Sequence, residues 1–144
     1  MSSVLILFIT RLLVFGCLIS ITSCFTRYRC GGFESAARHV PLRPPGWVFG
    51  AVWSLLFVTT GVAWANTSTG ELDAGLSVVT VLCCAWLAVY SCLKWKKVAA
   101  GVLLATTLLT ATLVKENWLL LPLALWTAFA SYLNVYDAFL KCKR

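Results

Sequence analysis

Long apolar runs separated by short polar segments dominate the chain. The runs are continuous and lack the alternation of apolar and polar residues that marks a half-buried strand. A helix that crosses a membrane needs about 20 mostly apolar residues. The pattern therefore predicts five spanning helices, over residues 4–25, 47–65, 74–93, 98–114 and 118–140. We expect an all-α membrane protein, a five-helix bundle that forms one domain over residues 1–144. A transmembrane β-barrel would need alternating strands.

Composition supports a membrane environment. The chain has 144 residues, of which 60% are hydrophobic, whereas soluble domains have about 45–50%. A soluble domain of this length buries too little surface to absorb that excess. The first run lacks a basic segment before it and is long for the apolar region of a cleaved signal peptide. We therefore interpret it as a retained span, with a cleaved signal as the alternative.

The positive charges are placed asymmetrically. The formal net charge is +7, and with five spans one side of the membrane receives Arg27, Arg29, Arg38, Arg43, Lys94, Lys96, Lys97, Lys141, Lys143 and Arg144. Basic loops favour the cytoplasmic side, so we predict a non-cytoplasmic N terminus and a cytoplasmic C terminus. These charges suit anionic lipid headgroups. Membrane lipid is thus an expected partner, and nucleic acid is not.

The reactive and ionisable residues give little sign of catalytic or metal chemistry. Seven cysteines are an odd number, and no C-x-x-C pair occurs, so we expect neither a disulfide framework nor a zinc site. Cys30 and Cys142 lie beside spans, as free or palmitoylated thiols. Arg11 and Asp137 lie within spans but at different depths, so we do not expect them to pair. Arg11 is expected to extend outward, and Asp137 to reach headgroups or Lys141.

The segment PPGWVFGAVW, residues 44–53, opens the second span in an unusual way. Proline is tolerated in the first turn of a helix, where its missing N–H has no partner. Trp47 then lies at the membrane interface, which favours tryptophan. Trp53 lies about 9 Å deeper, where an interfacial role no longer explains it. A tryptophan at that depth either packs the bundle or contacts a ligand.

Two motifs resemble the TspO/MBR family, the tryptophan-rich sensory proteins and translocator proteins, also called peripheral-type benzodiazepine receptors. The second span matches in PPGWVFGAVWSLLF followed by TGVAW, and the last span in LLLPLALWTAFASYLN. The third span is weaker: VTVLCCAW keeps Trp86 but has Val79 and Cys83 where the family has amides. Ala51 and Leu123 also depart from the family motif. The resemblance implies a five-helix bundle of the TspO/MBR type around a ligand cavity.

The same resemblance implies ligands and a site. Family members bind tetrapyrroles such as protoporphyrin IX and haem, and also sterols and aromatic drugs. Aromatic faces with a few polar groups suit such flat ligands. We expect a receptor, sensor or transporter-like protein that needs no cofactor and takes a porphyrin as its ligand. The expected ligand-binding residues are Trp47, Phe49, Trp53, Trp86, Trp126, Phe129, Ala130 and Asn134.

Three alternatives remain open. Leu133, Tyr136 and Lys141 fit a loose sterol-contact template, which favours a cholesterol-binding translocator. Some relatives degrade porphyrin in light, but the sequence has no triad, metal cluster or carboxylate pair, so we assign no catalytic residue. Small-residue pairs at 46/50 and 124/128 suit helix contacts, which favours an interaction module or homodimer. The host membrane, whether bacterial envelope, mitochondrial outer membrane or secretory membrane, is not determined by the sequence.

Overall fold

The computed structural model describes residues 2–31, 40–67 and 69–140, and over these residues it contains helices and no strand. Within these ranges, five helical segments are long and apolar enough to cross a membrane. The helices are α1 (Ser3–Cys30), α2 (Gly46–Ala65), α3 (Gly70–Ala88), α4 (Lys96–Leu113) and α5 (Leu121–Val135). Two π-helical turns, η1 (Val89–Leu93) and η3 (Tyr136–Leu140), continue α3 and α5, and a 3-10 turn, η2 (Trp118–Leu120), precedes α5. The predicted all-α bundle is confirmed.

Local signals fix where the helices begin and end. The Ser2 side chain caps α1 by accepting a hydrogen bond from the Leu5 N–H, and Gly31 ends it with a φ of 82°, which glycine adopts without strain. The first helix therefore runs to Cys30 rather than to residue 25. Its 28 residues extend about 42 Å, which exceeds the roughly 30 Å apolar thickness of a bilayer.

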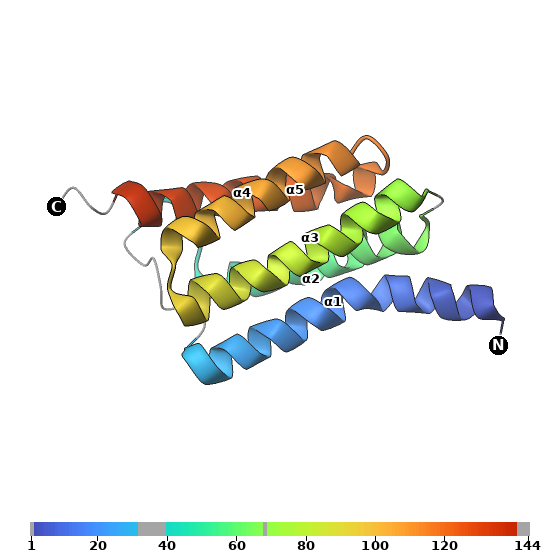
Figure 1. The fold of residues 1–144 in the computed structure, drawn as a ribbon, viewed down its shortest axis with the longest axis horizontal. Coiled ribbons are helices and arrows are strands. Elements are labelled where there is room, and N and C mark those ends of the chain that lie inside the picture. The colour runs from blue at the N-terminus through green and yellow to red at the C-terminus, as the bar shows by residue number, and fades with distance from the viewer. Residues whose placement is uncertain (1, 32–39, 68, 141–144) are drawn as a thin grey trace.

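Consecutive helices run antiparallel, with α2 and α3 between α1 on one side and α4 with α5 on the other (Figure 1). The C-terminal ends of α1 and α3 therefore meet the N-terminal ends of α2 and α4 at one end of the bundle. We call it the basic end, because the bounds of the helices place Arg27, Arg29, Arg43, Lys94 and Lys97 there.

Close packing of α1 on α2 depends on glycine. A Cβ atom built at Gly61 would collide with the Leu12 carbonyl oxygen, and one at Gly16 would lie 3.3 Å from the Phe57 side chain. Phe15 is fully buried beside this contact. Small residues at such positions let helix backbones approach in a membrane. A Cβ at Gly46 or Gly50 would meet nothing within 4 Å, so this predicted small pair makes no close helix contact within the chain.

We predict that Gly61→Ala lowers the free energy of unfolding by about 1–3 kcal/mol, the usual cost of overpacking. The added methyl group would force α1 away from α2. Gly101→Ala in α4 is the matched control, because a Cβ there meets nothing. Unfolding of both variants in mixed detergent micelles, followed by circular dichroism, measures the difference. Equal stability of the two variants would contradict the close approach.

A polar cluster joins three helices at the end opposite the basic end. One carboxylate oxygen of Asp73, in α3, accepts a hydrogen bond from Trp64 Nε1 of α2 at 2.6 Å. The same oxygen lies 3.2 Å from Arg11 Nε of α1. Arg11 thus has an acidic partner on α3, and Asp137 has a separate set of partners. This cluster anchors the N-terminal half of α1 to the bundle.

A disulfide joins Cys30, the last residue of α1, to Cys92 in η1. The expectation that Cys30 carries a free or lipidated thiol is therefore wrong, and the cysteine pattern of the sequence does not indicate this disulfide. The two residues are 62 positions apart in the sequence, and their Cα atoms lie 5.0 Å apart. Only the packing of α3 beside α1, with the two helices running parallel, brings them together, so their spacing in the sequence gives no signal. Cys142 lies outside the described residues.

Candidate ligand-binding site

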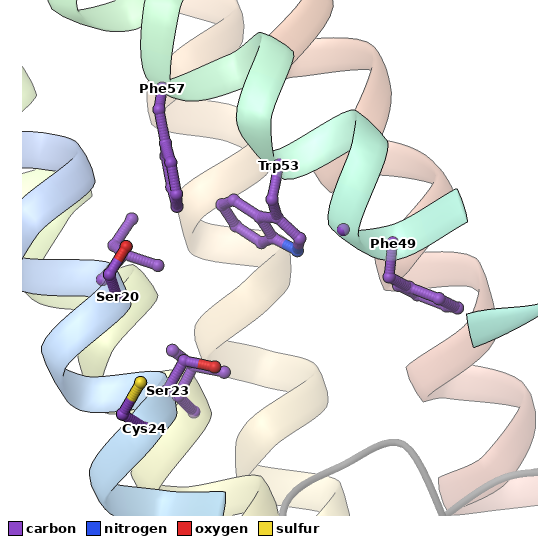
Figure 2. A pocket seen from close by; sticks show the side chains of 9 residues that line it. Ser20, Ser23, Cys24, Phe49, Trp53 and Phe57 are labelled. Carbon is purple, nitrogen blue, oxygen red and sulfur yellow. The ribbon is translucent and has the colours of Figure 1, made fainter. Parts of the chain in front are cut away.

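A hollow opens between α1 and α2 near the basic end, with a volume of about 250 Å³. It is lined by Ile19, Ser20, Ser23, Cys24, Phe49, Gly50, Trp53, Phe57 and Leu87. We call it the α1–α2 hollow. Figure 2 shows that its two walls differ: Ser20, Ser23 and Cys24 lie on α1, and the aromatic side chains project from α2. A ligand in this hollow would meet hydroxyl and thiol groups on one side and aromatic rings on the other.

The aromatic wall follows from helical spacing. Phe49, Trp53 and Phe57 recur every four residues, which places them on one face of α2. The ring centroids of Trp53 and Phe57 lie 5.9 Å apart with the planes tilted by 42°. Trp53 is half-buried, so part of its ring stays available to a guest. Aromatic faces of this kind favour flat apolar ligands.

A second apolar hollow of about 510 Å³ adjoins the first along the same helix pair. Its lining residues are Leu12, Leu13, Gly16, Cys17, Phe57, Val58 and Val62. Phe57 lines both hollows. The α1–α2 seam therefore carries two hollows that share Phe57 in their lining.

The aromatic wall continues into α5. The Phe49 ring meets the Trp126 ring at a centroid distance of 5.5 Å and an angle of 74°, an edge-to-face geometry that aromatic pairs favour. Trp126 in turn contacts Phe129 at 5.7 Å. Trp126 and Phe129 are half-buried behind Phe49 and do not line the α1–α2 hollow.

The other predicted site residues do not line the α1–α2 hollow. Trp86, Ala130 and Asn134 are buried in the bundle interior, where Trp86 Nε1 donates a hydrogen bond to Asn134 Oδ1 at 3.0 Å. This bond joins α3 to α5 and satisfies a polar group on each. Trp47 is 74% exposed and lies outside the lining of the hollow. Of the eight predicted residues, Phe49 and Trp53 line the hollow directly.

A buried polar cluster lies where the two π-helical turns meet α4. Asp137, in η3, is only 2% exposed. Its Oδ2 accepts a hydrogen bond from the Tyr90 hydroxyl of η1 at 3.1 Å and lies 2.8 Å from Lys96 Nζ of α4. The expectation that Asp137 reaches headgroups is therefore wrong. A buried carboxylate needs partners of this kind, and π-helical turns often mark functional positions.

A cation stands next to the aromatic wall. The Arg43 guanidinium carbon lies 5.7 Å from the centre of the Phe49 ring, within the range of a cation–π interaction. Arg43 precedes the two prolines that open α2, so the chain turn before this helix brings it over the ring. The basic end of the site thus presents a positive charge close to an aromatic surface.

The two sterol-contact candidates that the structure describes, Leu133 and Tyr136, do not form a shared open surface. Leu133 is buried and packs with Val40 and Phe49. Tyr136 is half-buried beside them. Lys141, the third member of the template, lies outside the described residues. The template residues that the structure describes therefore contribute to packing at the basic end.

Several residues at the site are not predicted from the sequence. Ser20 and Ser23 lie three positions apart in a mostly apolar helix, and this spacing puts two hydroxyls near one face. Tyr90 and Lys96 gave no local signal, because their contacts with Asp137 depend on how α3, α4 and α5 pack. The one available clue was Asp137 itself, since an ionisable residue within a span usually has a role.

These features define a class: a multi-pass helical membrane protein with an aromatic hollow between its first two helices. Comparison with protein families finds a match to the TspO/MBR family over residues 8–139. That match covers most of the chain, and the chain belongs to the TspO/MBR family. A comparison with curated proteins gives no match.

Proposed function

We propose that this protein binds porphyrins, such as protoporphyrin IX and haem, in the α1–α2 hollow and acts as a membrane receptor or sensor for them. The observation that carries the proposal is the aromatic wall of Phe49, Trp53 and Phe57 opposite the Ser20 and Ser23 hydroxyls. Family membership supports a sensor or transporter-like role. A flat apolar ring with a few polar substituents complements such a wall.

The polarity of the site favours an anionic ligand. Arg43 stands over Phe49 at the basic end, and guanidinium groups pair well with carboxylates. A porphyrin that stacks on Trp53 with its two carboxylates towards the basic end would bring opposite charges together. Its apolar edge would then extend along the seam towards Phe57 and the second hollow.

A comparison of protoporphyrin IX with its dimethyl ester tests the binding of the flat ring and the binding of the carboxylates separately. The ester keeps the flat ring and lacks the carboxylate charges. We expect wild-type protein in lipid nanodiscs to bind both ligands with one site per chain, measured by quenching of tryptophan fluorescence. Loss of a charge-assisted contact worth about 1.5–3 kcal/mol predicts that Arg43→Gln weakens protoporphyrin IX binding by roughly tenfold or more. The same substitution should leave binding of the dimethyl ester within about twofold.

The control is Arg29→Gln, which removes a charge at the same end. Neither arginine lines the hollow, but Arg43 lies over the ring of Phe49, which does, whereas Arg29 lies at the end of α1 beyond the lining residues. It should leave the affinity for both ligands unchanged. If wild-type protein binds neither ligand, the proposed function is wrong. If Arg43→Gln and Arg29→Gln weaken both ligands equally, the carboxylates do not contact Arg43.

A further inference from the structure

We propose that Cys30 and Cys92 form a reversible redox site that controls ligand access to the α1–α2 hollow. In the disulfide state, the C-terminal end of α1 is bonded to η1 and the hollow stays narrow. Reduction to two thiols releases that end of α1 and lets it move outward. This inference rests on the proposed function for its ligand, and it has a structural readout that is independent of the ligand.

The contacts of α1 support a movement in which its N-terminal half stays in place and its C-terminal half moves away from the bundle. Its N-terminal half is held by the Arg11–Asp73 ion pair and by the close approach of Leu12 to Gly61. Its last residue, Cys30, is held by the disulfide. Of the five spanning segments, α1 has the smallest buried share. A helix with few buried contacts separates from its neighbours at low cost when a link is removed.

The hollow lies between these two attachments. Its α1 wall, residues 19–24, comes after the Leu12–Gly61 contact and before Cys30. The α2 aromatic side chains face this wall, and α3 adds Leu87, which lies five residues before Cys92 in the same continuous helical segment. The disulfide thus ties the α1 wall to the α3–η1 segment that completes the hollow. Movement of the α1 wall away from α2 requires this end of α1 to leave η1.

The size of the hollow indicates which state admits a large ligand. About 250 Å³ is below the roughly 300–1,000 Å³ of typical ligand pockets. In the disulfide state this space accommodates one edge of a macrocycle. Outward movement of residues 19–24 would join the hollow to the neighbouring apolar space past Phe57. The reduced protein is therefore the form that admits a porphyrin fully.

The chemistry needs only a thiol or disulfide exchange partner. Two equivalents of a low-molecular-weight thiol such as glutathione break the S–S bond. Two electrons and two protons pass to the cysteine sulfurs, and the thiols leave joined as their disulfide. Oxidised glutathione reverses the step. Both cysteines belong to the basic end, which we predict faces the cytoplasm, where thiols are kept reduced. Oxidising conditions would then close the site.

The test compares oxidised full-length protein in nanodiscs with the same sample treated with dithiothreitol. Dithiothreitol reduces the bond and becomes a cyclic disulfide. We expect faster hydrogen exchange in residues 19–30 after reduction, with residues 5–14 unchanged. We expect protoporphyrin IX to associate faster and bind at least about fivefold more tightly, the lower range of typical coupling between sites. The Cys30→Ser/Cys92→Ser variant should show the exchange rates and porphyrin affinity of the reduced protein, and dithiothreitol should not change them. Cys84→Ser, which removes a free thiol that lines neither hollow, should respond like wild type.

The outcomes are distinguishable. Unchanged exchange in residues 19–30 on reduction would overturn the release of α1, and it needs neither ligand nor variant. Faster exchange with unchanged or weaker porphyrin binding would overturn the control of access. Faster exchange in a protein that binds porphyrin in neither state would uphold the redox-dependent release and reject the proposed function.

Discussion

Replacing Lys96 with methionine should destabilise the bundle more than any other single substitution of a solvent-accessible side chain. The variant removes the ammonium group that lies 2.8 Å from the Asp137 carboxylate, while the carboxylate side chain has no exposed surface. Breaking a buried ion pair by removing one partner costs about 3–5 kcal/mol. The Lys96 side chain is 37% exposed, so we expect a loss of about 2–3 kcal/mol, below a fully buried pair. Unfolding in mixed micelles measures this loss.

Two further variants show whether the charge is responsible. Lys96→Met combined with Asp137→Asn removes both charges and keeps an oxygen that accepts the Tyr90 hydrogen bond, so it should recover most of the lost stability. Lys97→Met, the matched control, removes a neighbouring lysine that lies over the Phe139 ring and should cost less than about 1 kcal/mol. A double variant as unstable as Lys96→Met would show that packing, not an isolated charge, causes the loss.

The second large effect is expected for Trp53→Leu, which should weaken protoporphyrin IX binding by roughly 30-fold. Trp53 lines the hollow, and a central tryptophan typically contributes about 2 kcal/mol or more to binding. Trp126→Leu should have a smaller effect, because Trp126 supports Phe49 from behind without lining the hollow. Leucine keeps an apolar side chain at both positions, and circular dichroism checks that the variants remain helical.

Trp47→Leu is the matched control for this prediction, since Trp47 lies on the same helix with 74% of its surface exposed. It should bind protoporphyrin IX like wild type. Because tryptophan is also the reporter, absorption of the bound porphyrin provides a second readout. Equal losses in the Trp47 and Trp53 variants would contradict the site.

The architecture was predictable from the sequence because it depends on local properties. The sequence by itself shows the apolar runs of spanning length, the Pro44–Pro45 start of α2 and the proline in the first turn of α5. The predicted end of the first helix, residue 25, is too early, because the charged residues Arg27 and Arg29 suggest a loop after the apolar run. In the structure the helix continues past the bilayer thickness until Gly31 ends it.

The site was less predictable because its contacts join distant segments. Motif resemblance pointed to Trp53 and Phe49, which line the hollow, and also to Trp86 and Asn134, which bond to each other inside the bundle. A tryptophan that binds a ligand and one that packs a core have the same sequence signature. The disulfide and the Lys96–Asp137 pair depend on which helices become neighbours, and the spacing of residues in the sequence does not contain that information.

The central claim is that a porphyrin binds between α1 and α2, and a structure of the protoporphyrin IX complex in nanodiscs tests it most directly. We predict a macrocycle stacked on the Trp53 ring, with Ser20 and Ser23 on its other side and its carboxylates towards Arg43. A macrocycle found on the outer surface near Trp47, or on the lipid-facing side of α4 and α5, would contradict it.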